Sequence, residues 1–193
     1  MADDKLRRVV TVFGSSRVQP DEPEYEEARR LGTLFATHGW TVCNGGHDGT
    51  MEAAARGAKE AGGSTIGVSL GLYRPANRNI WLDQEIVAES LFARLEQLVT
   101  LGSAYVVLRG GIGTLLEMSL VWNLVQSPEF AGKPIVVVGN AWRRLLRTFK
   151  DNFPAHPWEA NSIEVVDTID EAVDRLAAHF VNAGKSPRRS KSR

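Results

Sequence analysis

Cysteine is almost absent from this chain of 193 residues, which contains only Cys43. A single cysteine excludes an intrachain disulfide, and its place in an apolar run favours a small buried side chain over a nucleophile. The four histidines, His38, His47, His156 and His179, lack metal-ligand spacing. We therefore predict no redox role and no metal site, although His47 lies in a turn where it can touch a ligand.

The chain also lacks an excess of charge and a long apolar run. Lys plus Arg number 23 and Asp plus Glu number 23, so no surplus of positive charge is available to bind a nucleic-acid backbone. No stretch approaches the roughly 20 apolar residues of a membrane-spanning helix. The charged start Met1–Lys5 leads into an apolar run that is too short for a signal peptide. We predict a soluble, cytoplasmic protein that binds neither nucleic acid nor membrane.

Short apolar runs recur along the chain, with segments of helical character between them. Continuous runs rich in β-branched residues are typical of strands buried on both faces of a parallel sheet. The alternation predicts an α/β fold, namely a Rossmann-like, doubly wound, three-layer sandwich with a mainly parallel sheet of six to seven strands. The runs are Val9–Phe13, Trp40–Cys43, Thr65–Val68, Ala104–Leu108, Ile135–Val138 and Ile163–Val166.

The segments between these runs predict helices. Pro23–His38 carries an apolar stripe, acidic residues near its start and Gly39 directly after it. Ser90 is a suitable N-cap for a helix that ends at Gly102. Further helices are expected at Thr50–Ala61, Thr114–Ser127, Ala141–Asn152 and Ile169–Asn182.

The length of the chain favours one hydrophobic core. We predict a single domain over residues 1–182 and a disordered basic tail over residues 183–193, because the tail has almost no apolar content. The segment Ser69–Asn79 interrupts the alternation and is too long for a tight connection. It is long enough to cover a ligand.

Three Gly-rich turns each join a predicted strand to a predicted helix. In an open parallel sheet, ligands bind beyond the carboxyl ends of the strands. Glycines let backbone N–H groups face a phosphate, and a helix N-terminus adds a favourable dipole. We interpret the turns as one nucleotide site; the alternative is that they are tight turns without a ligand. They are Gly14-Ser15-Ser16, Asn44-Gly45-Gly46-His47-Asp48-Gly49-Thr50 and Arg109-Gly110-Gly111-Ile112-Gly113-Thr114.

Glu117 lies about one helical turn beyond the third of these turns. A carboxylate is a poor ligand for a phosphate, so its useful partners are ribose hydroxyls, a water molecule or positive charge that develops on a sugar carbon. The alternative is a capping box in which Thr114 is the N-cap and Glu117 reaches back to it.

The segment Gly110–Glu117 resembles the Pro-Gly-Gly-x-Gly-Thr-x-x-Glu motif of the LOG family, the cytokinin riboside 5′-monophosphate phosphoribohydrolases. The resemblance spans Val9–Val166 and includes Phe13–Ser16 and Gly45–Met51. In this family a catalytic arginine precedes the motif strand, and Arg94 stands at the matching position.

The resemblance implies cleavage of the N-glycosidic bond of AMP or a cytokinin-type nucleotide to the free base and ribose 5-phosphate, with no metal or organic cofactor. It implies catalytic roles for Arg94 and Glu117, and a homodimer in which the motif helix packs against a second subunit. The residues expected to hold the nucleotide are Gly14, Ser15, Ser16, Gly45, Gly46, Gly49, Arg109, Gly110, Gly111, Gly113 and Thr114.

Several residues depart from the family pattern. Arg109 stands where the motif has proline, and it either adds a cation beside the phosphate or points to solvent. Asn44 and Glu52 replace glycines around the second turn, and Ala93 and Leu95 alter the flanks of the catalytic arginine. These changes leave a second function open, that of a non-catalytic carrier of the same superfamily that binds a nucleotide or a molybdenum cofactor.

Overall fold

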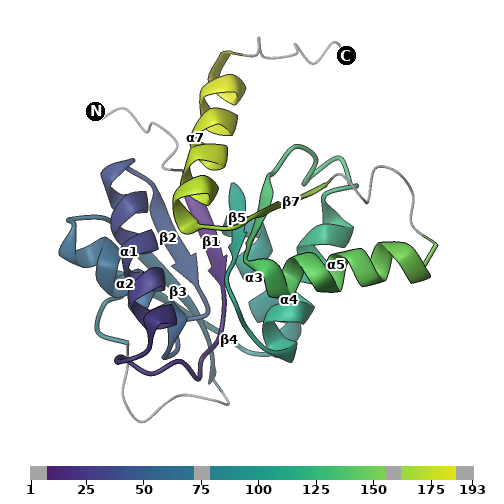
Figure 1. Cartoon of the computed structure of the whole chain (residues 1–193). Coiled ribbons are helices and arrows are strands. Elements are labelled where there is room, and N and C mark those ends of the chain that lie inside the picture. Colours follow the sequence, from purple (N-terminus) through teal and green to yellow (C-terminus); the bar gives the residue numbers. More distant parts are fainter. Residues whose placement is uncertain (1–7, 72–78, 155–161, 186–193) are drawn as a thin grey trace, which may run out of the picture.

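The computed structural model describes residues 8–71, 79–154 and 162–185, which form a three-layer α/β sandwich (Figure 1). A seven-stranded parallel sheet lies in the middle, in the order β4-β3-β2-β1-β5-β6-β7. The Rossmann-like fold predicted from the sequence is confirmed. The strands are β1 (Val9–Phe13), β2 (Thr41–Asn44), β3 (Thr65–Leu70), β4 (Gln84–Ala88), β5 (Ala104–Val107), β6 (Ile135–Val138) and β7 (Ile163–Val166).

Helices cover both faces of the sheet (Figure 1). Alternate residues of a strand point to opposite faces, so Val10 and Val12 of β1 enter one core whereas Phe13 enters the other. The first core is shared with α1, α2 and α7, and the second with α3, α4 and α5. The bounds are α1 (Pro23–Thr37), α2 (Thr50–Glu60), α3 (Leu91–Leu101), α4 (Ile112–Leu124), α5 (Asn140–Asn152) and α7 (Ile169–Lys185).

Strand β4 is the strand that the sequence pattern did not predict. It lies at the edge of the sheet, and most of its residues are partly or fully exposed. It therefore lacks the continuous apolar run of a strand buried on both faces. The loop predicted over residues 69–79 is wrong for Ser69 and Leu70, which belong to β3; residues 72–78 lie outside the described residues.

Helix α4 begins two residues earlier than the sequence predicted, at Ile112 instead of Thr114. Its N-cap is Gly111, so Thr114 lies inside the first turn and is buried. The capping box that was the alternative explanation for Glu117 is therefore wrong. The predicted N-cap of α3 is confirmed, because the backbone N–H of Ala93 donates to Oγ of Ser90 at 3.1 Å.

The C-terminal helix α7 continues to Lys185, beyond the limit of 182 that the sequence indicated. The rest of the segment predicted as a disordered tail, residues 186–193, lies outside the described residues. Within the described ranges, every helix is too short or too polar to cross a membrane.

Candidate functional site

A cavity of about 630 Å³ opens at the carboxyl edge of the sheet. Strand β1 lies between β2 and β5, so the order of the strands reverses there, and such a switch point is the usual ligand site of doubly wound sheets. The cavity is lined by Gly14, Ser15, Ser16, Arg17, His47, Asp48, Met51, Leu70, Leu91, Arg94, Gly111, Ile112, Gly113, Thr114 and Glu117.

The turn after β1 is held against the start of α2. The backbone N–H and the hydroxyl of Thr50 both donate to the carbonyl of Ser15, at 2.9 and 3.1 Å. A Cβ on Gly14 would overlap Oγ1 of Thr50, and a Cβ on Gly49 would overlap the carbonyl of Ser15. Gly49 also has a φ of +68°, which disfavours other residues. These glycines bring the first two turns together.

The turn after β2 is fixed by Asn44, one of the departures from the family pattern. Its Oδ1 accepts from the N–H of Gly46 at 2.8 Å, and its Nδ2 donates to the carbonyl of Met51 at 2.9 Å. Gly46 adopts a φ of +72°. The buried amide of Asn44 thus satisfies polar groups inside the turn.

Arg94 extends from α3 into the floor of the cavity and is bound on three sides. Its Nε donates to the carbonyl of Val68 at 2.8 Å, and Nη2 donates to the carbonyl of Gly45 at 3.2 Å. Its Nη1 lies 3.3 Å from Oε1 of Glu117. A Cβ on Gly45 would overlap Nη2, so only glycine leaves room for the guanidinium. The arginine is a fixed cation in the wall of the cavity.

Glu117 is the titratable group whose position matters most here. Only 12% of its side chain is exposed. Burial raises the pKa of Glu117 to about 7, although the adjacent Arg94 guanidinium acts to lower that pKa. Near neutral pH the carboxyl group is therefore present in both protonation states and can accept or donate a proton.

The N-terminus of α4 forms another wall of the cavity. Gly111, Ile112, Gly113 and Thr114 line it, and no side chain caps the first turn of this helix. A helix N-terminus presents backbone N–H donors and a positive partial charge to an anion. Gly110 lies behind this turn, where a Cβ would overlap Oγ1 of Thr114.

Arg109 does not line this cavity. Its side chain is 76% exposed and its Nη1 pairs with Oε1 of Glu24 at 3.0 Å. It lines a separate, smaller cavity of about 360 Å³, together with Glu24 and Trp142. Of the other expected nucleotide-binding residues, Gly45, Gly46, Gly49 and Gly110 shape the surrounding turns and do not line the cavity.

His47 lines the cavity from the turn after β2 and is half-buried. Burial lowers the pKa of His47, and the charge of Arg94 lowers it further, whereas Asp48 and Glu85 act to raise it. The imidazole is therefore neutral at pH 7 and offers one hydrogen-bond donor and one acceptor.

The remaining lining residues were not assigned to the site from the sequence. Arg17 and Asp48 lie next to or within the predicted turns, so proximity to those turns was the available signal. Ile112 likewise lies within the third predicted turn, whereas the apolar side chains of Met51, Leu70 and Leu91 come from three different elements, and no sequence spacing brings these three together. Among the described residues, no group of three or more His, Cys, Asp or Glu side chains is placed to hold a metal ion.

The parallel sheet, the cavity at its switch point and the buried pair of Arg94 and Glu117 define a Rossmann-like α/β protein with a candidate ligand site. Residues 7–169 match the model of the SLOG cluster4 family. The chain belongs to this family, which confirms the resemblance to LOG proteins seen in the motifs.

Two curated relatives are named cytokinin riboside 5′-monophosphate phosphoribohydrolase. The protein from Mycobacterium tuberculosis is 32% identical over 165 residues, which is 79% of this chain and 84% of the relative. The protein from Mycobacterium marinum is 30% identical over 190 residues, which is 91% of this chain and 97% of the relative. Among solved structures, the molybdenum cofactor carrier protein from Chlamydomonas reinhardtii has a TM-score of 0.72 at 27% identity, covering 91% of this chain and 99% of its own.

Proposed function

We propose that this protein is a nucleoside 5′-monophosphate phosphoribohydrolase. The reaction consumes water and converts AMP or a cytokinin-type nucleotide into the free base and ribose 5-phosphate. The observation that carries the proposal is the pair of Arg94 and Glu117, buried side by side in the switch-point cavity. The two mycobacterial relatives named for this activity support it.

Glu117 acts on the sugar in this mechanism. The bond between C1′ and the base nitrogen breaks with its electron pair going to the base, which leaves an oxocarbenium-like ribose. The carboxylate of Glu117 stabilises this positive charge and orients the water that adds to C1′. The water gives up a proton and the base takes one up, so the step balances. General-base assistance of this kind contributes about 10²–10⁴ in rate.

Arg94 acts through Glu117. Its guanidinium stays protonated at all relevant pH values, so it is unsuited to proton transfer. Its bonds to the carbonyls of Val68 and Gly45 fix its position, and its third contact orients the carboxylate. The phosphate is assigned to the N-terminus of α4 and to the hydroxyls of Ser15 and Ser16, which line the same cavity.

The test is incubation of the purified protein with AMP and with isopentenyladenosine monophosphate, followed by chromatography for the free base and ribose 5-phosphate. The wild-type protein should release base, and Glu117→Ala should lower the rate by about 10²–10⁴. Arg94→Ala should lower it as well. Arg109→Ala is the matched control, because Arg109 lies outside the cavity and should leave the rate unchanged.

A non-catalytic carrier is the second candidate function. The likeness to the Chlamydomonas reinhardtii molybdenum cofactor carrier protein favours it, because that structure matches nearly the whole chain at 27% identity. Such a protein would bind its ligand in the same cavity without turnover. AMP binding without any release of adenine, or tight binding of a molybdopterin with no product, would support the carrier and contradict the hydrolase.

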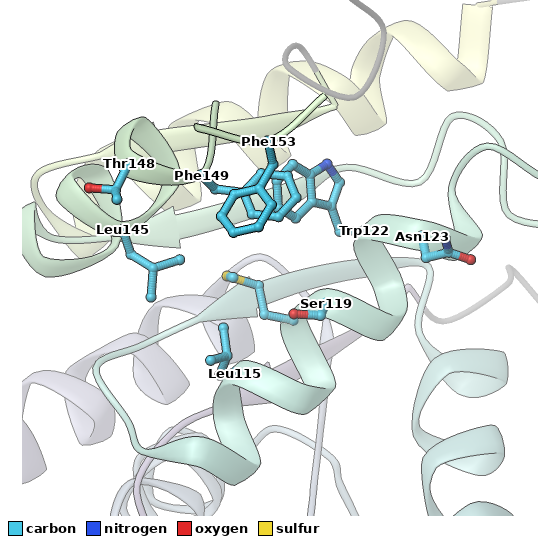
Figure 2. Close-up of a pocket in the computed structure, with 9 residues that line it drawn as sticks. Leu115, Ser119, Trp122, Asn123, Leu145, Thr148, Phe149 and Phe153 are labelled. Carbon is cyan, nitrogen blue, oxygen red and sulfur yellow. The ribbon is translucent and has the colours of Figure 1, made fainter. Parts of the chain in front are cut away.

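We further propose that the protein forms a homodimer through α4 and α5. An open groove of about 710 Å³ lies between these helices, and its lining is largely apolar (Figure 2). Along it, the rings of Trp122 and Phe149 meet edge to face with centroids 5.2 Å apart, and those of Phe149 and Phe153 stack with centroids 5.0 Å apart. The exposed fractions of Phe149 and Phe153 are 36% and 56%. A second copy would cover these rings.

The cytoplasmic location stays a prediction from the sequence.

A further inference from the structure

The order of the strands spreads the lining residues of the cavity along the edge of the sheet. Strands β1 and β5 are neighbours, so the turn at Ser15–Arg17 lies beside the N-terminus of α4. On the other side of β1, His47 lies in the turn after β2 and Leu70 is the last residue of β3. The β1–β5 end thus holds Arg17, the hydroxyls of Ser15 and Ser16 and the backbone N–H groups at the start of α4, next to the apolar Ile112. The β2–β3 end holds His47, Asp48 and Leu70.

Arg17 is the cation at the β1–β5 end. Its backbone is anchored on both sides, since its N–H donates to Oγ of Ser15 at 3.1 Å and its carbonyl accepts from the side chain of Gln19 at 2.9 Å. Arg17 lines the cavity and is exposed, and within the described ranges its side chain makes no hydrogen bond and no ion pair. Asp48 lines the same cavity but lies beyond ion-pair distance of it.

The two other arginines of this region already have hydrogen-bond or ion-pair partners. Arg94 is bound by Glu117 and two carbonyls, and Arg109 is paired with Glu24 outside the cavity. The cation that the sequence suggested at Arg109 is therefore supplied at Arg17. A guanidinium fork matches the oxygens of a phosphate monoester, which is largely dianionic at neutral pH.

We propose that Arg17 recognises the 5′-phosphate and makes the site selective for nucleotides over nucleosides. The inference rests on the proposed function for the identity of the ligand, a nucleoside monophosphate. It adds that the ribose phosphate lies over β1 and β5, beside Ser15 and the start of α4. The base then points toward His47 and Leu70, with the pair of Arg94 and Glu117 as the reacting centre.

The experiment compares Arg17→Ala with Arg109→Ala, using AMP and adenosine as substrates. Losing a charged hydrogen bond to phosphate should raise the KM for AMP about 10- to 100-fold in Arg17→Ala and leave kcat nearly unchanged. The kcat/KM for adenosine should not change, so the preference for AMP should fall by the same factor. Arg17→Lys keeps the charge without the fork and should give an intermediate KM.

Binding of ribose 5-phosphate by calorimetry, with ribose as the reference, gives a readout that does not depend on turnover. Weaker binding to Arg17→Ala than to wild type, with Arg109→Ala unchanged, supports the inference even where no base is released, and in that case only the hydrolase proposal fails. The inference is overturned if Arg17→Ala and wild type bind ribose 5-phosphate with equal affinity. It is also overturned if only Arg109→Ala loses affinity for ribose 5-phosphate.

Discussion

Nη1 of Arg94 lies 3.3 Å from Oε1 of Glu117, and only 11% and 12% of the two side chains are exposed. Arg94 reaches this point from α3 and Glu117 from α4, on opposite sides of β5 in the chain. A buried carboxylate is costly unless it is paired. Here the pairing compensates only in part. Burial raises the pKa of Glu117 by more than the charge of Arg94 lowers it, so the pKa stays raised.

The raised pKa of Glu117 predicts how base release depends on pH. If the carboxylate is the active form, kcat/KM for AMP should rise with pH through an inflection near 7, the value to which burial raises the pKa of Glu117. The measurement is kcat/KM between pH 5 and 9. The affinity for ribose 5-phosphate over the same range controls for ionisation of the phosphate. A flat profile would rule out titration of Glu117 in the reaction.

The same pKa predicts a pH-dependent stability. The folded protein holds the proton of Glu117 more tightly than the unfolded chain does, so its contribution is most favourable below the unfolded value of 4.5 and is lost as pH rises through about 7. The loss amounts to roughly 3 kcal/mol. Glu117→Gln should therefore raise the free energy of unfolding relative to wild type at pH 8.5.

Urea unfolding at pH 4.5 and at pH 8.5 measures this effect. The gain from Glu117→Gln should appear at pH 8.5 and shrink at pH 4.5. Arg94→Ala is the opposite control, because within the described residues it removes the only ion-pair partner of the carboxylate and should destabilise the protein most at high pH. If the free energy of unfolding of Glu117→Gln differs from that of wild type by the same amount at both pH values, the prediction is contradicted.

Gly45→Ala tests the space that Arg94 occupies. A Cβ at this position would overlap Nη2 of Arg94 and lie 2.7 Å from Sδ of Met51. The guanidinium must move, which should cost about 1–3 kcal/mol of stability and lower the rate of base release by about 100-fold. Gly71→Ala is the control, because its Cβ would make only ordinary contacts of 3.6 and 3.7 Å. Equal rates in the two variants would show that the position of Arg94 is not critical.

The layers of the fold can be predicted from local patterns in the sequence. Apolar runs such as Ile135–Val138 are buried on both faces, and the pattern marks them as strands of a parallel sheet. The edge strand β4 has no such pattern, since its pairing with β3 and not its own composition makes it a strand. Patterns that depend on burial thus predict the central strands and the edge strand β7, but they miss the more exposed edge strand β4.

The site divides in a similar way. The Gly-rich turns carry local information, and the strand ends bring them together as expected. The partner of Arg109 is Glu24 of α1, which is distant in the sequence, so no spacing could tell whether Arg109 faces the cavity or solvent. Arg17 stands directly after the first turn, but no feature of the neighbouring sequence tells whether its guanidinium is paired or free to bind a ligand.

The groove between α4 and α5 predicts the oligomeric state. A charge placed in an apolar interface is left without a partner, so Phe153→Asp should dissociate the dimer. Light scattering at micromolar concentration should give the mass of two chains for wild type and of one chain for the variant. Val181→Asp is the matched control, because Val181 is 54% exposed and belongs to α7, which packs on the opposite face of the sheet from α4 and α5. A wild-type monomer would remove the dimer proposal, and dissociation by Val181→Asp alone would place the interface on α7 instead.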